Sequence, residues 1–484
     1  MKTITAPPFP HSITASGTAS ACRSRLAFWV PLLGAACLAA GCTTYHPLPL
    51  TPRDTAMHDV RQLTLNHQRV DLPGLAPHPF DPARPLDMTD VAILAVANNP
   101  DLKLARADSG IAHAQAFSAG LLPDPQFNLT RDFPSASGLV SAFNAGLSFD
   151  FTSLITLSAR RNASDADQRK ADLVLLWQEW QAVAQARKLF VDVVFLDRST
   201  ELQRQSLALA EQRVQAAQQA IQAGNATLDA LTPYLVAQED ARRQLDDQTR
   251  QRMQARHALN AFLGLAPEVH LDLAPPSAYP ALDAKGIRQA LENLPNRRPD
   301  LLALSAGYQA QEARLRAAVL AQFPSLNFGI TRARDTAASY TRGFTASISL
   351  PIFNRNRGNI SIETATRARL HDEYQNRVNT AYADVALILD DQKLVDAQMR
   401  ATTDAVATLA RTAEAADAAY RAHSLTLNAY VDLQSSLRTK RADLLALQRT
   451  SMQQRIALQS LLGGEMPQAA ASNTSSPSPS QDPK

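Results

Sequence analysis

The sequence predicts a mainly α fold with a small β portion, in which long antiparallel coiled-coil helices accompany four β-strands per chain. Two segments, from about Leu154 to Ala223 and from Asn359 to Ala422, contain no proline and almost no glycine. At 1.5 Å per residue, a helix of roughly 65–70 residues reaches on the order of 100 Å. This length exceeds that of a globular helix and indicates coiled-coil packing. Short runs in which apolar and polar residues alternate supply the strands.

The chain also contains an internal repeat, with corresponding segments about 199 residues apart. The four matching pairs are Asn99–Leu102 with Arg298–Leu301, Pro125–Phe127 with Pro324–Leu326, Gly224–Ala230 with His423–Ala429, and Ala258–Gly264 with Ala457–Gly463. Four pairs at one spacing predict a duplicated architecture. Each half is expected to form a helix, a pair of strands and then two long helices.

The strands are predicted from strict period-2 alternation. Apolar residues alternate with polar ones from Phe143 to Phe151 and from Phe344 to Ile352, and partner strands precede them near Phe127 and Leu326. Such strands have one apolar and one polar face, as a strand needs when lipid lies on one side and water on the other.

Returning helices are expected from about Leu228 to Leu263 and from Leu427 to Leu462. Pro233 lies in the first turn or so of the first of them, where its missing N–H is tolerated. The predicted domain organisation follows from these elements and from composition. It comprises a lipoprotein signal peptide (1–41), an extended N-terminal arm (42–86), a first repeat (87–266), a Pro- and Ala-rich linker (267–284), a second repeat (285–464) and a disordered Ser- and Pro-rich tail (465–484).

The leader has the features of an export signal. Arg23 and Arg25 precede an apolar run that ends at Ala40, and Gly41 and Cys42 follow. Cys42 after small residues resembles a bacterial lipobox, in which the thiol is acylated; the alternative is an ordinary secretory signal with an incidental cysteine. By resemblance to bacterial lipoproteins, Thr43 after the cysteine suggests the outer membrane. Because all three cysteines lie in this leader, processing at Cys42 would leave no thiol for disulfides, zinc or catalysis.

Several classes of function are disfavoured. The 48 basic residues nearly balance the 45 acidic ones, which argues against a nucleic-acid-binding protein. No two of the ten histidines have helical metal-ligand spacing, so no metal site is predicted. Neither a phosphate-binding loop nor a Gly-x-Ser-x-Gly elbow occurs, so we expect a non-enzyme without a cofactor.

Four strands cannot close a membrane barrel, since single-chain barrels use at least about eight. Open sheet edges in lipid would leave backbone groups without hydrogen bonds, so several chains are expected to pool their strands.

The motifs Arg298–Leu301, Ala321–Leu326 and Leu350–Ile360 carry a specific resemblance. Over nearly all of the mature sequence, the chain resembles the TolC-type outer-membrane efflux protein family. The resemblance implies a homotrimer with a 12-stranded transmembrane barrel and a long periplasmic tunnel of helices. It also implies a passive exit duct, anchored in outer-membrane lipid, that docks onto a periplasmic adaptor (a membrane fusion protein) and an inner-membrane pump of the resistance-nodulation-division (RND) type.

Within that family, Leu121–Pro125 and Phe353–Ile360 are similar to the heavy-metal cation branch, so heavy-metal cations are the expected cargo. The alternatives are a drug or small-molecule duct of the same family, and a periplasmic coiled-coil scaffold lipoprotein without a pore. A scaffold or adaptor would need other β domains around one hairpin, whereas this chain has two hairpins. An envelope hydrolase lacks a recognisable nucleophile and base.

The resemblance also implies two kinds of site. The tips that contact the adaptor would comprise Gly224, Asn225, Thr227 and Leu228 at one turn and His423, Ser424, Thr426 and Leu427 at the other. Asp432 matches a constricting aspartate of the family's periplasmic gate, with Tyr430 beside it, while Ala429 occupies the place of a second acidic residue. The alternatives are a solvated helix-face carboxylate for Asp432 and a core-packing role for Tyr430.

Overall fold

The computed structural model describes residues 45–62, 78, 80–81, 84–276 and 283–463. The chain divides into two units, residues 1–55 and 56–484. The described part of the first unit, residues 45–55, has no helix or strand. The predicted signal peptide, Cys42 and the tail from residue 465 lie outside the described residues. All that follows concerns the second unit.

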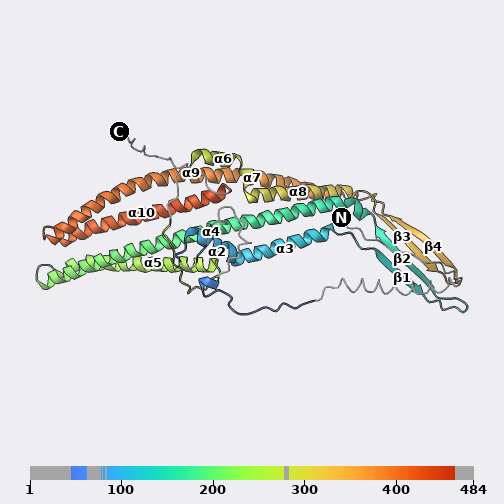
Figure 1. The fold of residues 1–484 in the computed structure, drawn as a ribbon, viewed down its shortest axis with the longest axis horizontal. Helices are drawn as coiled ribbons and strands as arrows, with labels where there is room; N and C mark the ends of the chain where they lie inside the picture. Colours follow the sequence, from blue (N-terminus) through green and yellow to red (C-terminus); the bar gives the residue numbers. More distant parts are fainter. Residues whose placement is uncertain (1–44, 63–77, 79, 82–83, 277–282, 464–484) are drawn as a thin grey trace, which may run out of the picture. The chain divides into compact units, whose positions relative to one another are not determined.

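Apart from the short helices η1, η3 and α7, both halves of this unit have the same order of elements (Figure 1). After the short 3₁₀ helix η1 (Val60–Gln62), the first half comprises α2 (Met88–Asn98), α3 (Pro100–Gly120), β1 (Gln126–Asp132), β2 (Ala142–Asp150), α4 (Thr152–Gln222), the 3₁₀ helix η3 (Leu228–Leu231) and α5 (Thr232–Phe262). The second half comprises α6 (Ala284–Glu292), α7 (Leu294–Arg297), α8 (Pro299–Leu320), β3 (Leu326–Arg334), β4 (Tyr340–Ile348), α9 (Arg357–Arg421) and α10 (Leu427–Leu461). The predicted mainly α fold with four strands is confirmed.

Two predicted strand ends are wrong. The β4 strand was expected to continue to Ile352 but ends at Ile348, because Pro351 has no N–H for a ladder and Ile352 instead donates a hydrogen bond to Leu350 O (2.8 Å). Phe151 was expected in β2 but is the N-cap residue of α4. The first returning helix also differs, because residues 228–231 form η3 and the α-helix begins only at Thr232, next to Pro233.

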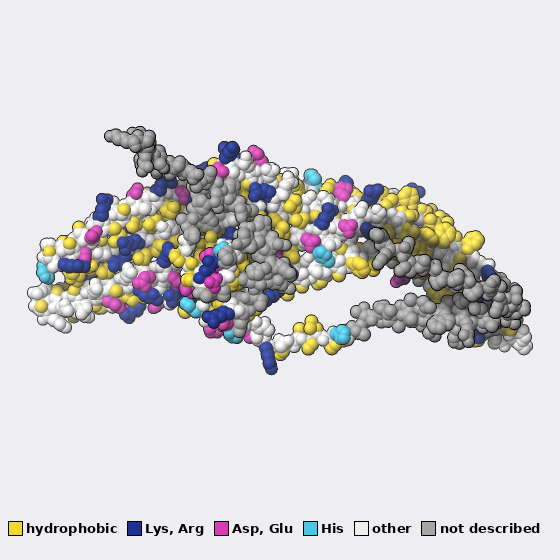
Figure 2. Space-filling view, in the orientation of Figure 1, with side chains coloured by type: hydrophobic (Ala, Val, Ile, Leu, Met, Phe, Trp, Pro, Cys, Tyr) yellow, Lys and Arg dark blue, Asp and Glu magenta, His cyan; other side chains and the backbone are white. Residues whose placement is uncertain are grey.

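The four strands form one antiparallel sheet in the order β1-β2-β3-β4, and β2 and β3 join the two halves. Residues directly opposite each other share a face, so the register defines both surfaces. Phe127, Leu147, Ile330 and Phe344 form one row across all four strands. The opposite face carries short uncharged side chains, as in the row Asn128, Gly146, Thr331 and Gly343. Figure 2 shows hydrophobic side chains gathered over β3 and β4.

The helices form two long hairpins, α4 with α5 and α9 with α10, whose turns lie at the end away from the sheet (Figure 1). Helix α4 also packs against α3, α8 and α10. The main hydrophobic core lies along the middle of α4, where Phe190 and Val191 are fully buried against Leu94, Leu259 and Leu263. Burying a side chain of this kind stabilises the fold by about 1.5–3 kcal/mol.

Elsewhere the buried helix positions are often alanine, as at Ala159, Ala163 and Ala166 of α4. Alanine keeps the helix propensity high and lets neighbouring helices approach closely. None of the helices in the described ranges combines the length and the apolar character that crossing a bilayer would require.

Candidate functional site

The turn between α4 and η3 is closed by backbone hydrogen bonds around a glycine. Gly224 has φ 72°, which glycine adopts without a steric penalty. The N–H of Asn225 donates to Ala220 O (2.8 Å) and that of Gly224 to Ile221 O (2.9 Å), so two carbonyls at the helix end are satisfied. Leu228 begins η3 and remains 74% exposed.

The turn between α9 and α10 repeats this geometry with a histidine in place of the glycine. His423 has φ 55°, and Ser424 N–H donates to Ala419 O (2.9 Å). A non-glycine residue in this region costs on the order of 1–3 kcal/mol, so the surrounding turn holds His423 in a strained conformation. Thr426 caps α10 by accepting a hydrogen bond from Ala429 N–H, and Leu427 is the first residue of that helix. The eight residues predicted at the tips therefore lie at two equivalent hairpin turns.

One arginine near these turns links three helices. Arg213 of α4 donates from Nη2 to the carboxylate of Asp432 (2.5 Å) and to Asn428 O (3.1 Å) on α10. Its guanidinium lies 5.5 Å from the ring centroid of Tyr234 on α5, and the Tyr234 hydroxyl accepts a hydrogen bond from Asn428 Nδ2 (2.9 Å). We call Arg213, Tyr234, Asn428 and Asp432 the hairpin lock.

The two partners of the ion pair differ in exposure. The Arg213 side chain is 19% exposed, whereas that of Asp432 is 68% exposed. The arginine is held against the packed helices, and the carboxylate lies at the surface. Asp432 is therefore a solvent-exposed helix-face carboxylate that is paired with Arg213, and removing it would leave a mostly buried guanidinium without its anionic partner.

Tyr430 lies beside the lock but does not contact Asp432 through a described hydrogen bond. Its ring stacks on Tyr420 of α9 with centroids 4.8 Å apart and an interplanar angle of 11°. This stack ties the first turn of α10 to the last turn of α9, which fits the packing alternative for Tyr430.

A groove of about 540 Å³ lies behind the lock, between α4, α5 and α10. Arg213 and Tyr234 line one part of it and Arg438 another. Burial lowers the pKa of the Arg438 guanidinium; Tyr430 partly opposes this shift, and nearby Arg441 adds to it. The groove therefore contains two arginines between helices of opposite hairpins, next to a surface carboxylate.

Sequence reasoning missed three members of the lock: Arg213, Tyr234 and Asn428. Their partners are about 200 residues away in the sequence, so no local motif contains them. The repeat offers a signal that could have identified the pair. Arg213 and Asp432 each lie about ten residues from the turn of their own hairpin, so they lie at the same height when the two hairpins pack side by side.

The Arg298-Pro-Asp-Leu motif, by contrast, has a structural role. Arg298 donates from Nε to Asp300 Oδ1 (2.9 Å) and from Nη2 to Oδ2 (2.7 Å), and Arg377 of α9 donates to the same Oδ2 (2.9 Å). The Arg298 guanidinium also lies over the ring of Trp177 on α4 at 5.1 Å. Burial raises the pKa of Asp300, but the two guanidiniums outweigh it and the net shift is downward.

One group of possible metal ligands occurs that spacing did not reveal. His78 Nε2 lies 3.1 Å from Asp90 Oδ1 and 3.4 Å from Asp87 Oδ2. Arg84 Nη2 also lies 3.3 Å from Asp90 Oδ1 and from His78 Nε2. Both aspartates accept backbone N–H groups in the capping box of α2. The Arg84 guanidinium offsets one of the two carboxylate charges, and both carboxylates already accept hydrogen bonds, so these donors fit a helix cap with ion pairs better than a cation site.

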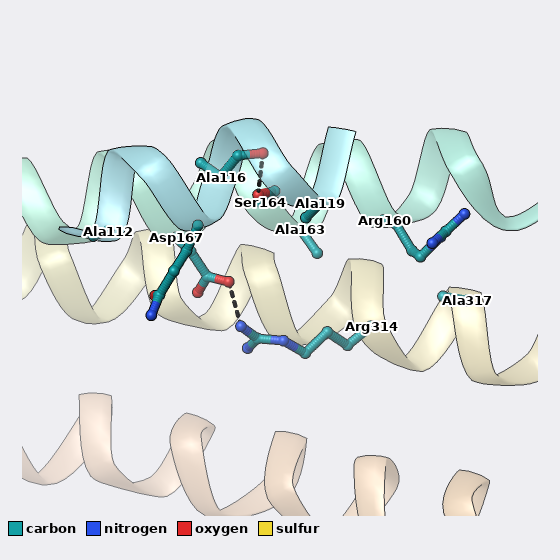
Figure 3. A pocket seen from close by; sticks show the side chains of 10 residues that line it. Ala112, Ala116, Ala119, Arg160, Ala163, Ser164, Asp167, Arg314 and Ala317 are labelled. Atoms are coloured by element: carbon teal, nitrogen blue, oxygen red, sulfur yellow. Dashed lines mark hydrogen bonds and ion pairs between the residues drawn. The ribbon is translucent and has the colours of Figure 1, made fainter. Parts of the chain in front are cut away.

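A pocket of about 510 Å³ opens between α3, α4 and α8 (Figure 3). Its labelled lining is largely alanine, and Ser164 Oγ donates to Ala116 O (3.1 Å). The Asp167 and Arg314 side chains point toward each other and form an ion pair. These two charges neutralise each other. Arg160 also lines the pocket, but most of the remaining wall is formed by alanine methyl groups, so we interpret the pocket as a packing gap between helices.

The class of protein is defined by this architecture, in which an amphipathic four-stranded sheet continues into two long paired hairpins. Residues 289–464 match the family model described as "Outer membrane efflux protein". Residues 289–464 are therefore similar to that family, and the chain shares the fold of solved outer-membrane channels.

Two relatives and one solved structure illustrate the similarity. The cobalt-zinc-cadmium resistance protein CzcC of Cupriavidus metallidurans is 25% identical over 310 residues, which cover 62% of this chain and 72% of that protein. The pyoverdine export outer membrane protein OpmQ of Pseudomonas putida is 26% identical over 402 residues, covering 77% and 84%. A crystal structure of CusC has a TM-score of 0.63 at 22% identity and covers 82% of this chain and 98% of that one.

Proposed function

We propose that the chain is one subunit of a homotrimeric exit duct in the bacterial outer membrane. In this proposal, solutes reach the duct from an inner-membrane RND-type transporter through a periplasmic adaptor. The observation that carries the proposal is the sheet, which has one apolar and one small polar face and continues directly into the long hairpins.

The trimer is supported by the open edges of that sheet. Strands β1 and β4 each have one side without a partner strand among the described residues. Lipid cannot satisfy these backbone groups, so a membrane-embedded sheet must close on other copies. Three copies joined edge to edge provide enough strands to enclose a water-filled lumen.

Heavy-metal cations are the cargo we propose. CzcC is named for cobalt, zinc and cadmium resistance, and the sequence of this chain carries segments of the heavy-metal type. The name of OpmQ, a pyoverdine exporter at similar identity, keeps export of small organic molecules as the second candidate. Deletion of the gene separates them, because selective sensitivity to zinc, cobalt or cadmium supports metal export and sensitivity to drugs alone contradicts it.

The hairpin lock is proposed to hold the periplasmic mouth closed, with Asp432 and Tyr430 at the gate. The eight residues of the two turns are the proposed docking tips for the adaptor, since seven of them are exposed. Acylation of Cys42 would anchor each subunit to lipid and leave the helices free to reach into the periplasm.

The gate is tested by conductance in planar bilayers. We expect Arg213→Gln to raise the open probability several-fold, because it removes the ion pair to Asp432 and the hydrogen bond to Asn428. The matched control is Arg243→Gln, which removes an arginine paired with Asp240 on the surface of the same hairpin. Wild-type conductance in Arg213→Gln, or equal opening in the control, would contradict a role for the lock in closure.

A further inference from the structure

Four arginines lie on the apolar face of the sheet, near the turns that join the strands. The register places Arg131, Phe143, Arg334 and Tyr340 in one row, and Leu129, Ala145, Arg332 and Arg342 in the next. Counted from the turns toward the helices, the row after these two is the apolar row that contains Phe127 and Phe344. We call Arg131, Arg332, Arg334 and Arg342 the arginine cluster.

No carboxylate pairs with the cluster in the part of the chain that the structure describes. Asp132 lies at a position of the opposite face, opposite Ala142. Asp335 accepts the N–H groups of Ala337 and Ser339 within the β3–β4 turn. The four positive charges are therefore not neutralised by this chain's own described carboxylates.

The arrangement is costly without an anion. Arg332 and Arg342 are directly opposite each other on neighbouring strands, and like charges at such positions destabilise a sheet. Both side chains are exposed. Two guanidiniums side by side are well suited to bind phosphate oxygens through paired hydrogen bonds.

The other two arginines are already positioned. Arg334 donates to Ser141 O (2.5 Å) and Arg131 to Ser141 Oγ (3.4 Å), so one serine holds both guanidiniums at the same strand end. Arg334 also lies 5.9 Å from the ring of Tyr340, which packs against Phe143. Arginines beside aromatic rings at the border of an apolar surface are typical of a membrane interface.

The position of the cluster agrees with such a border. From Ile348 to Arg342 the strand extends about 20 Å at 3.3 Å per residue, or about 15 Å along the membrane normal at a tilt of about 40°, which is most of the roughly 25 Å apolar band of outer-membrane sheets. The helices leave the sheet at the other end. If the sheet spans the outer membrane as proposed above, the cluster lies at the leaflet away from the periplasm.

We infer that the arginine cluster binds the phosphate groups of a membrane lipid whose acyl chains lie on the apolar face of the sheet. This inference rests on the proposed function, and its partner is a phosphorylated glycolipid of the outer leaflet. The guanidiniums of Arg332 and Arg342 bind the phosphate, and Phe344, Ile330 and Leu147 contact the chains.

The test measures lipid binding to the purified full-length protein by native mass spectrometry. The probes are lipid A with both phosphates and the same lipid after dephosphorylation. We expect the double variant Arg332→Gln/Arg342→Gln to bind the phosphorylated lipid on the order of tenfold more weakly than the wild type. The charge-matched control is Arg400→Gln/Arg411→Gln, which removes two exposed arginines of α9 and should bind as the wild type does.

A second variant separates charge from folding, because Arg332→Lys/Arg342→Lys keeps the charges and should retain most of the binding. Unchanged binding by the glutamine variant, or equal binding of both lipids by the wild type, would overturn the inference. Wild-type conductance in neutral phosphatidylcholine bilayers is measured in parallel. Pores without phosphate-dependent binding contradict the lipid site alone, whereas absence of pores contradicts the proposed channel itself.

Discussion

At the scale of single residues, the first residue of the duplicated motif has different roles in the two halves, at Asn99–Leu102 and at Arg298–Leu301. Asn99 caps α3, because its Oδ1 accepts the N–H of Leu102, and its Nδ2 donates to Phe262 O. Arg298 at the equivalent place does not cap α8 but forms a buried ion pair with Asp300. Asp101, which corresponds to Asp300, is exposed. The repeat could be predicted from the sequence, but this exchange of roles could not, because it depends on Trp177 and Arg377 from other helices.

This divergence provides a matched pair of substitutions. Asp300→Asn should destabilise the protein by about 3–5 kcal/mol, because it leaves the buried Arg298 guanidinium without its counter-charge. Asp101→Asn should change stability by less than about 0.5 kcal/mol, as exposed substitutions do. The temperature at which the purified oligomer dissociates measures both. Equal shifts for the two variants would show that the ion pair does not stabilise the fold.

The same carboxylate predicts a pH dependence. The pKa of Asp300 is lowered in the folded chain, so its stabilising contribution is fully present above its unfolded pKa of about 3.9. The contribution is lost as the pH falls through the lowered folded pKa. We therefore expect the stability gap between wild type and Asp300→Asn to be constant from pH 7 to about 5 and to narrow below pH 4. A gap that widened on acidification would contradict the sign of the shift.

At the scale of elements, the two longest helices, α4 and α9, were predictable to within two residues, whereas the start of α5 and the strand ends were not. The absence of proline and glycine defines α4 and α9 directly. The alternation near Phe344 continues past the true end of β4, because apolar residues at 350 and 352 follow the same period without pairing. The end of a strand is set by its ladder hydrogen bonds to a neighbouring strand, and the alternation of apolar and polar residues does not show where these hydrogen bonds stop.

The helix ends also provide a test of backbone geometry. Gly224 and Gly463 both have φ 72°, but an added Cβ would meet no atom within 4 Å at Gly224 and would lie 3.0 Å from the backbone carbon of Arg297 at Gly463. Gly224→Ala should cost about 1 kcal/mol from backbone strain, and Gly463→Ala about 1–3 kcal/mol more. Thermal unfolding measures the difference. The control is Gly110→Ala in the interior of α3, where an added Cβ meets no atom within 4 Å and alanine should stabilise the helix by about 0.5–1 kcal/mol. Equal losses at both turns would rule out the contact with Arg297.

At the scale of the whole molecule, the proposed closure of three sheets can be tested by crosslinking. Within one chain β1 and β4 are separated by two strands, roughly 14 Å at 4.8 Å per strand, which is too far for a disulfide. Asn128→Cys on β1, combined in turn with Thr341→Cys, Thr345→Cys or Ser347→Cys on β4, should form disulfides only between chains. We expect at least one pair to yield a covalent trimer on a non-reducing gel, and the single variant Asn128→Cys to yield none. Failure of every pair would contradict edge-to-edge closure.

The site residues show where the limits of the sequence lie. The hairpin turns followed from glycine and from the repeat, so the tips could be located without a structure. The partner of Asp432 could not be predicted from the sequence, because Arg213 lies on a different hairpin and contacts Asp432 only when α4 packs against α10. Likewise, alternation predicted an apolar face, but only the register shows that Arg332 and Arg342 lie directly opposite each other on it.

The polar face of the sheet has a consequence for permeation. Its interior positions are occupied by Asn, Thr, Ser, Gly and Ala, and charged side chains occur only at the strand ends, as at Asp132 and Asp150. Short neutral groups hold no ion strongly, so a solute moving along this wall meets no deep energy well. Ions of either sign would therefore diffuse past it at rates set by the width of the lumen. In the proposed channel, discrimination between solutes by their charge would therefore arise outside this wall.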